Sequence, residues 1–257
     1  MARDKKLIIG NWKMNLNVHE ASLYLNKLEK TVKSHRNVEV VLAPTLLAIQ
    51  TLSLQVNLRQ FKLAAQNFYW RDYGAFTGEV SAAQLRGVVN YGLIGHSERR
   101  HIFHENDKDT RAKVQAAIRN DITPVLCIGE TAAERAAGEM VDILHDQLIG
   151  GLANITSEEA SDIVIAYEPV WAIGTGDNAT TSDVLAASRA IRAQLKHLFG
   201  AKVSQEARIL YGGSVTAESA ASYLSLAGVD GLLIGGASLD AVAFSDIIEK
   251  AFESDKK

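Results

Sequence analysis

A glutamate in the segment AYEPVWAIGTG, residues 166–176, is the first candidate for chemistry. A carboxylate that follows a buried strand is costly to desolvate unless it has a partner or a function. Pro169 restricts Glu168 to an extended backbone conformation, and this fixes the direction of the carboxylate. Taken alone, such a glutamate is most simply one half of a salt bridge at the end of a strand.

The residues after Pro169 form a candidate lid. Its members are Val170, Trp171, Ala172, Ile173, Gly174 and Thr175. Most are apolar, although they stand where an exposed loop is expected, and the glycines at 174 and 176 can adopt unusual backbone angles. This pattern predicts a loop that closes, excludes water and makes the Glu168 carboxylate a stronger base.

A histidine in IGHSERR, residues 94–100, stands where a strand gives way to a helix. The positive end of a helix dipole disfavours protonation, so we expect His96 to be a neutral imidazole that can still donate an N–H to a substrate oxygen. The alternative is a structural histidine that caps or packs. His101 and His104 follow, but the segment lacks the HExxH metal pattern, and we expect both at the surface.

The segment NWKMN, residues 11–15, offers a cation at the end of the first strand. Lys13 could be an ordinary solvated lysine. However, Glu98 is available as its partner from another strand end, and a phosphorylated substrate needs a positive charge. Asn11 can hydrogen-bond a developing oxyanion or hold Lys13 in place.

Two short glycine-rich turns, YGGSV at 211–215 and GG at 235–236, follow the last two apolar runs. Each is weak by itself, because glycine is the default turn residue. Together they match the phosphate site of α/β barrels, where backbone N–H groups hold the anion.

All these candidates lie at the ends of short apolar runs that alternate with amphipathic segments. The runs are 7–9, 38–43, 63–65, 92–94, 123–128, 163–166, 209–211 and 231–234, and the clearest amphipathic segments are 111–119, 142–152, 181–198 and 241–252. Continuous apolar runs are typical of strands buried on both faces. The alternation predicts a parallel α/β fold but leaves open a closed barrel or an open doubly wound sheet. A barrel would gather the strand ends around one mouth.

Composition excludes several other classes. The chain has 257 residues, 47% of them hydrophobic, and a net charge of -3, so no basic surplus indicates nucleic acid or an anionic membrane as partner. No apolar run approaches the roughly 18 residues of a transmembrane helix, and the N-terminus lacks a secretory signal. The single cysteine, Cys127, is expected in the core and suits a reducing, cytoplasmic compartment. No linker divides the chain, so we expect one domain over residues 1–257.

The ordered set of segments resembles the triosephosphate isomerase family over nearly the whole chain. The segments are NWKMN, AQN at 65–67, GAFTGE at 74–79, IGHSERR, CIGE at 127–130, AYEPVWAIGTG, YGGSV and GG. The resemblance implies a single-domain (β/α)8 TIM barrel. It also implies the reversible interconversion of glyceraldehyde 3-phosphate and dihydroxyacetone phosphate in glycolysis and gluconeogenesis, through an enediolate, with no metal or organic cofactor.

The resemblance also implies a role for each candidate residue. Glu168 is the base, His96 the neutral electrophile, and Lys13 and Asn11 support the enediolate. The residues expected to bind the substrate and its phosphate are Asn11, Lys13, Gly174, Ser214, Gly235 and Gly236. Glu98 and Cys127 are expected to support the site. The segment 177–181 differs from the common family pattern, which bears on the hinge of the lid.

The GAFTGE segment implies a symmetric homodimer. Its dimer loop comprises Gly74, Ala75, Phe76, Thr77 and Gly78. In the family this loop projects into the neighbouring subunit and supports its Asn11 and Lys13 region. Two alternatives remain: another phosphate-binding barrel enzyme, and a non-catalytic barrel that binds a phosphate ligand. The presence of Glu168, His96 and Lys13 argues against the second.

Overall fold

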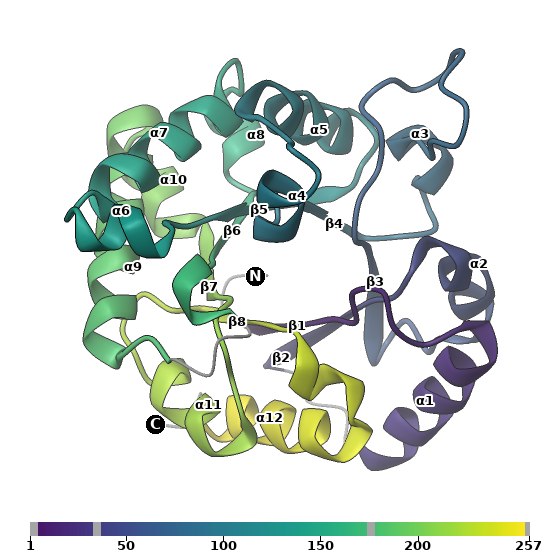
Figure 1. The fold of residues 1–257 in the computed structure, drawn as a ribbon. Coiled ribbons are helices and arrows are strands. Elements are labelled where there is room, and N and C mark those ends of the chain that lie inside the picture. Colours follow the sequence, from purple (N-terminus) through teal and green to yellow (C-terminus); the bar gives the residue numbers. More distant parts are fainter. Residues whose placement is uncertain (1–4, 33–36, 174–177, 255–257) are drawn as a thin grey trace.

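Eight parallel strands form a closed barrel in the computed structural model, which describes residues 5–32, 37–173 and 178–254. Figure 1 shows the helices surrounding the central strands. The strands are β1 (Lys6–Asn11), β2 (Val38–Ala43), β3 (Phe61–Ala65), β4 (Tyr91–Ile94), β5 (Thr123–Ile128), β6 (Val164–Tyr167), β7 (Arg208–Tyr211) and β8 (Gly231–Ile234). All eight apolar runs are therefore strands, with ends that differ from the expected ones by two residues at most.

The pairing of β1 with β8 confirms the closed barrel that the family resemblance implied and that the strand pattern alone left open. β1 pairs in parallel with β2 on one side and with β8 on the other, where Leu7 lies opposite Gly231. An open sheet would instead leave two unpaired edges. The backbones of β1 and β8 approach each other closely here, because a Cβ at position 231 would lie 1.9 Å from the carbonyl oxygen of Leu7. Glycine is thus required where the barrel closes.

Helices alternate with these strands. They are α1 (Val18–Thr31), α2 (Leu46–Gln55), α3 (Ala82–Leu85), α4 (Ser97–His101), α5 (Asp107–Arg119), α6 (Ala132–Ala136), α7 (Met140–Leu152), α8 (Ser157–Ala160), α9 (Thr181–Phe199), α10 (Ala201–Glu206), α11 (Ala217–Leu224) and α12 (Ala241–Ser254). Two 3-10 turns, η1 (Val170–Ala172) and η2 (Gly236–Leu239), follow β6 and β8. Within the described ranges, none of these helices is long and apolar enough to cross a bilayer.

Capping residues set the starts of the helices. The four expected helices are present, but α5 begins at Asp107, four residues earlier than expected, because Asn106 accepts backbone hydrogen bonds at its start. The N-cap of α9 is Thr180, which stands just before the expected Thr181, and Asp183 completes its capping box. Asn11 is the last residue of β1 and does not follow it.

The core has two layers, which explains why the apolar runs are continuous. Leu7 and Ile9 point into the barrel with Val41 and Leu93, whereas Ile8 packs between the strands and the surrounding helices. Side chains alternate along a barrel strand between its interior and its helix-covered exterior. Both faces are therefore apolar, and neither face of a strand needs polar residues.

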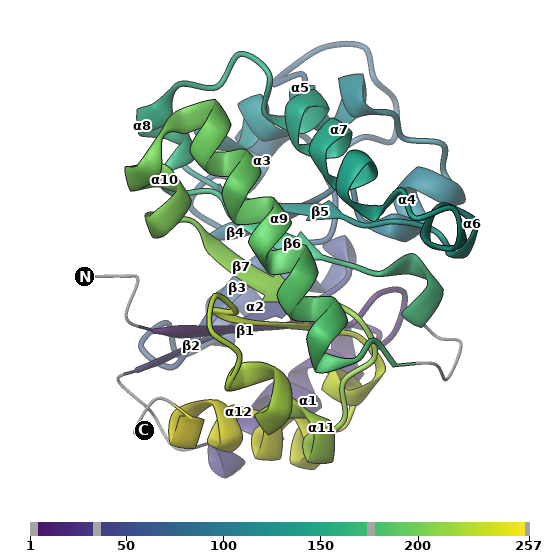
Figure 2. The same cartoon turned by 90° about the vertical axis from the view of Figure 1, so that its left-hand side faces the viewer.

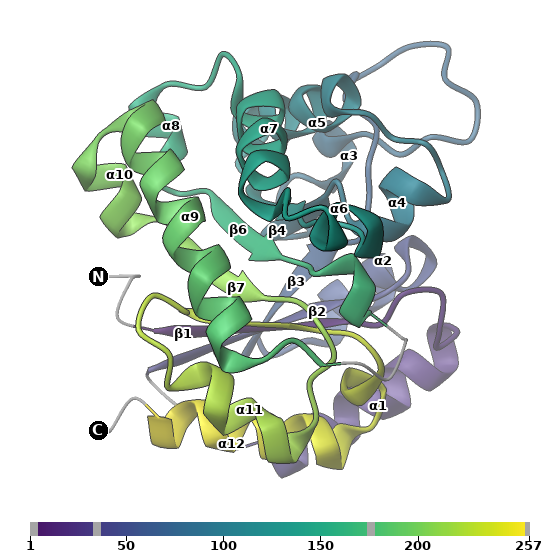
Figure 3. The ribbon, with the colours of Figure 1, turned by 60° about the vertical axis from the view of Figure 1, so that its left-hand side comes forward.

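The carboxyl ends of the strands lie on the side of the barrel that carries α4 and α6, as the side view in Figure 2 shows. Polar residues at these ends therefore meet at one mouth. The connection between β3 and α3 extends away from the body of the molecule (Figures 1 and 3). This connection contains the dimer loop expected from the sequence.

Candidate active site

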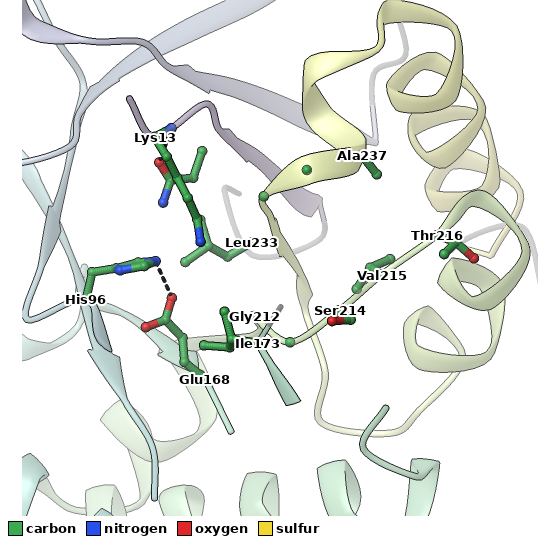
Figure 4. Close-up of a pocket in the computed structure, with 14 residues that line it drawn as sticks. Lys13, His96, Glu168, Ile173, Gly212, Ser214, Val215, Thr216, Leu233 and Ala237 are labelled. Atoms are coloured by element: carbon green, nitrogen blue, oxygen red, sulfur yellow. Dashed lines mark hydrogen bonds and ion pairs between the residues drawn. The ribbon is translucent and has the colours of Figure 1, made fainter. Parts of the chain in front are cut away.

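A pocket of about 280 Å³ opens at the mouth of the barrel. Its lining comprises Asn11, Lys13, His96, Glu168, Ile173, Gly212, Gly213, Ser214, Val215, Thr216, Leu233, Gly235, Gly236 and Ala237. Figure 4 shows Glu168, His96 and Lys13 together, with Ser214 to Thr216 and Ala237 further along the wall. The structure thus brings together most of the residues that the sequence singled out, from five separate strand ends, although Glu98 and Cys127 do not line the pocket. Gly174 and Thr175 lie outside the described residues.

The Glu168 carboxylate is only 2% exposed, yet it has few partners. The backbone N–H of Ser97 donates to Oε2 over 3.0 Å, and Nε2 of His96 lies 3.1 Å from Oε1. Among the described residues, no lysine or arginine lies within ion-pair distance of it. A buried carboxylate without a cationic partner, facing a pocket, can accept a proton from a bound molecule. No sequence pattern points to Ser97, because its contact is made by the backbone.

Two glycines leave room for Glu168. A Cβ at Gly129, just after β5, would lie 1.8 Å from the carbonyl oxygen of Glu168. A Cβ at Gly212, just after β7, would lie 2.9 Å from its Cγ. The neighbouring strand ends therefore pack directly against both the backbone and the side chain, and fix where the carboxylate can lie.

His96 is the N-cap residue of α4 and is 6% exposed. Its Nδ1 accepts a hydrogen bond from the backbone N–H of Glu98 over 3.2 Å. Because a backbone N–H can only donate, Nδ1 carries no proton, and the ring proton lies on Nε2. The geometry therefore favours a neutral imidazole that directs an N–H toward Glu168 and the pocket. The Glu98 carboxylate, whose Oε2 lies 3.7 Å from Nδ1, makes no hydrogen bond to this nitrogen.

Lys13 has an unusual backbone conformation, with φ of 53°. Such angles are uncommon for residues other than glycine and are found where the surroundings hold them in place. The Lys13 N–H donates to Asn11 Oδ1 over 3.1 Å, and Gln66 Nε2 donates to the carbonyl oxygens of Lys13 and Ala43, each over 2.8 Å. The ammonium pairs with Glu98 at 2.6 Å. Gln66 is thus a supporting residue to which sequence reasoning gave no role.

The described part of the candidate lid, residues 170–173, is tied to its neighbours at its base. Trp171 Nε1 donates to Glu130 Oε1 over 2.8 Å, and the Tyr167 hydroxyl donates to the same oxygen over 3.0 Å. The Ser214 hydroxyl and N–H both donate to the carbonyl oxygen of Ala172, over 2.7 and 3.2 Å. Ser214 therefore contacts the lid as well as lining the pocket. Sequence reasoning gave no role to Glu130, the last residue of the segment CIGE at 127–130.

Cys127 lies in β5 and is completely buried. Burial raises the pKa of its thiol well above the ordinary value, and the charge of Glu168 raises it further. A protonated, inaccessible thiol is a core residue and a poor nucleophile. No group of three or more His, Cys, Asp or Glu residues able to hold a metal ion is found in residues 5–32, 37–173 and 178–254.

The family model and the relatives that match this chain all carry the same name. A family model described as "Triosephosphate isomerase" matches residues 6–251, which include every residue of the pocket. Relatives of that name include one from Streptococcus mutans, 40% identical over 246 residues, covering 95% of this chain and 98% of the relative. Another, from Clostridium perfringens, is 40% identical over 243 residues, covering 94% and 98%. A third, from Thermodesulfovibrio yellowstonii, is 43% identical over 246 residues, covering 95% and 99%.

Proposed function

Because this chain belongs to the triosephosphate isomerase family, we propose that Glu168 and His96 perform the proton transfers of that reaction. The protein is an isomerase that reversibly interconverts glyceraldehyde 3-phosphate and dihydroxyacetone phosphate, a step of glycolysis. The residue assignment is carried by one observation, the 3.1 Å contact of Glu168 Oε1 with His96 Nε2 at the pocket wall. A non-catalytic barrel and a different phosphate-binding enzyme are not favoured, since the matches span nearly the whole chain.

The shape of the pocket suggests how a triose phosphate binds. The substrate has a dianionic phosphate at one end and reacting carbons at the other. The glycine-rich turns, with Ser214, Gly235 and Gly236, can hold the phosphate through backbone N–H groups. The reacting carbons then lie toward Glu168 and His96, and the Lys13 ammonium adds positive charge nearby.

The proton transfers follow from these positions. Glu168 removes a proton from the carbon beside the carbonyl group, and the bonding electrons move to the carbonyl oxygen to give an enediolate. The His96 N–H and the Lys13 ammonium stabilise the negative oxygen, where charge develops. His96 donates its Nε2 proton to the enediolate oxygen and takes up the hydroxyl proton from the neighbouring oxygen, and the protonated Glu168 then returns its proton to the neighbouring carbon. Aldose and ketose interconvert without any net oxidation.

The lid has a chemical purpose in this scheme. An enediolate phosphate exposed to water can expel its phosphate, and a closed site suppresses that side reaction. Ile173 already lines the pocket, and η1 is anchored by Glu130 and Ser214. We therefore propose that residues 170–175 cover the intermediate; Gly174 and Thr175 belong to this assignment from the sequence alone.

The test of the catalytic assignment is Glu168→Gln, which keeps the shape of the side chain and removes its basicity. We expect kcat to fall by about 10³-fold, because a positioned general base contributes on the order of 10²–10⁴-fold. A coupled assay with glyceraldehyde 3-phosphate measures this, with Glu158→Gln on the exposed surface of α8 as the matched control. Activity of Glu168→Gln within twofold of the control would reject the assignment.

We further propose that the enzyme is a homodimer in which the dimer loop, residues 74–78, docks on the partner. Large apolar side chains are exposed in and beside the loop, where Tyr73 is 84% and Phe76 39% exposed, and also at Met14, next to Lys13 in the chain and 94% exposed. Exposed apolar groups of this size are typical of an interface. Arg119 holds the start of the loop through a bidentate contact with Asp72, at 3.0 and 3.1 Å.

The dimer proposal predicts the effect of Phe76→Arg, which would place a charge in the interface. We expect a monomer in sedimentation velocity, with at least tenfold lower specific activity, because the loop would no longer support the Lys13 region of its partner. Val242→Arg, at another exposed apolar position, is the control. A fully active monomer would contradict the proposal.

We place the enzyme in the cytoplasm, because its reaction belongs to glycolysis. The free thiol of Cys127 is compatible with a reducing compartment. Fractionation of cells that express the tagged full chain tests this assignment, and activity confined to another compartment would contradict it.

A further inference from the structure

Arg135, on α6, contacts residues on both sides of the candidate lid. Its guanidinium carbon lies 4.0 Å from the centre of the Trp171 ring, in η1, where the lid begins. Its Nη2 lies 2.8 Å from Oδ1 of Asp183, in the first turn of α9, which follows the lid. Figure 3 shows α6 and the segment after β6 on the same side of the barrel. One side chain thus joins the two segments between which the lid is suspended.

The charges around Trp171 explain why a cation is placed there. Glu130 is completely buried, and its Oε1 accepts hydrogen bonds from both Trp171 and Tyr167. Its Oε2 has no hydrogen-bond partner among the described residues. Arg135 Nη1 lies 3.8 Å from Oε1 and supplies a compensating positive charge. The Trp171 ring is therefore held at its edge by a carboxylate and on its face by a guanidinium.

Arginine suits this position better than lysine would. A planar guanidinium can stack on an aromatic face while its N–H groups bind a carboxylate in its own plane, whereas an ammonium cannot do both. Asp183 is itself fixed, because its other oxygen accepts from the N–H of Thr180 over 2.9 Å in the capping box of α9. The contacts thus connect the rigid start of a long helix to the base of the lid.

We propose that Arg135 is a positioning residue for the isomerase reaction, which holds Trp171 and the base of the lid against the start of α9. It is absent from the lining of the pocket, so it acts through Trp171 and Asp183 and makes no contact with substrate. The inference rests on the proposed role of residues 170–175 as a lid. Its consequence is that Arg135 limits how often the enediolate loses phosphate.

Replacement of Arg135 should therefore change the fate of the intermediate as well as the rate. For Arg135→Gln we expect a three- to tenfold fall in kcat and a several-fold rise in the fraction of turnovers that release inorganic phosphate. Arg135→Lys, which keeps the charge but cannot stack and pair at once, should give an intermediate result. A residue that only stabilised the fold would change the thermal midpoint and leave the fraction of phosphate release unchanged.

The experiment measures triose isomerisation and inorganic phosphate release in parallel for both variants. Arg189→Gln, on the exposed side of α9, is the matched control. Trp171→Leu, alone and combined with Arg135→Gln, completes a double-mutant cycle. If Arg135 acts through Trp171, the double variant should release no more phosphate than Trp171→Leu alone.

Two results would overturn the inference. One is a fraction of phosphate release in Arg135→Gln and Arg135→Lys equal to that of the control. The other is that the effects of Arg135→Gln and Trp171→Leu on the fraction of phosphate release add fully in the double variant. A wild-type protein that failed to isomerise the triose would instead refute the proposed function, so the two failures are distinguishable. Should Arg135→Gln not fold, Arg135→Lys and its cycle with Trp171→Leu decide the question.

Discussion

The two ends of the barrel each hold a glutamate with little exposure, 10% for the Glu39 side chain and 2% for that of Glu168, but they surround it with different partners. The barrel floor, at the amino ends of the strands, consists of Glu39, Lys62, Tyr91 and Arg208. There Glu39 accepts from Arg208 Nη1 and from the Tyr91 hydroxyl, each over 2.9 Å, and forms an ion pair with Lys62. The barrel mouth consists of Lys13, His96, Glu98 and Glu168, where Glu168 meets one backbone N–H and a neutral histidine.

The difference is visible in the electrostatics of the floor. Burial alone would raise the pKa of Glu39, but the hydrogen bond and charge of Lys62 and the charge of Arg208 outweigh it and lower the pKa. Burial likewise raises the pKa of Tyr91 to about 12, so its hydroxyl remains a donor. The Glu39 carboxylate is thus paired with two cations within the cluster.

Burial of a carboxylate is therefore not by itself a sign of catalysis. A carboxylate paired with cations is stabilised as an ion and holds the fold together, whereas one that faces a pocket with only neutral donors can take a proton. This agrees with the general division of labour in (β/α)8 barrels, in which the carboxyl ends carry chemistry and the amino ends carry stability. Substitutions at the two ends should accordingly separate activity from stability.

The largest effect is expected for Lys13→Met at the mouth. Removal of the ammonium should lower kcat/KM by about 10²–10³-fold, because a preorganised group that stabilises developing charge is worth about that factor. The matched variant at the floor is Lys62→Met, which should retain activity within twofold. Steady-state kinetics of both proteins test the comparison. Similar losses in the two would mean that the ends do not differ in function.

A smaller effect on rate is expected for Ile173→Ala, which shortens a lid residue that lines the pocket. We expect kcat to fall by about tenfold and phosphate release from the intermediate to rise, since water enters the site more readily. Parallel measurement of isomerisation and inorganic phosphate separates the two outcomes. An unchanged ratio between them would count against the lid, and Ile149→Ala on α7 is the control.

The smallest effect on rate is expected at the floor, for Glu39→Gln. Removing the carboxylate leaves Arg208, whose side chain is only 11% exposed, without its anionic partner, which should lower the free energy of unfolding by about 3 kcal/mol. Activity at 25 °C should stay within twofold of wild type. Urea unfolding combined with kinetics measures both quantities. A tenfold loss of kcat without loss of stability would contradict the assignment of the floor.

The effect of Glu39→Gln on the free energy of unfolding should depend on pH, in a direction that follows from the pKa of Glu39. The pKa of Glu39 lies below the ordinary value of 4.5 in the folded protein, so the unfolded chain takes up this proton first as the pH falls. The carboxylate therefore contributes its full stability above about pH 4.5 and loses it as the pH falls through the lowered folded pKa. The stability difference between wild type and Glu39→Gln should accordingly shrink from pH 7 to pH 3. A constant difference would mean that another interaction accounts for it.

Much of the site could be read from residue positions along the chain. Asn11, Lys13, His96 and Glu168 all stand at or beside the ends of apolar runs, and any parallel sheet brings such ends to one edge. The contacts of Ser97 could not be read in this way, because a backbone N–H has no sequence signature. Gln66 and Glu130 are polar residues after strand ends. Their hydrogen-bond partners come from other strand ends, so their supporting roles could not be predicted from their own segments.

The sequence by itself determined the alternation of strands and helices, the strand ends at which we propose that the chemistry takes place, and the family, because these depend on local periodicity and on the order of motifs. Local periodicity alone could not decide that the sheet closes, and the tertiary structure shows it through the pairing of Leu7 with Gly231, which joins residues from the two ends of the chain. Closure also brings Glu39 to Arg208, 169 residues away. Such contacts follow from the geometry of the whole barrel, which no local pattern encodes.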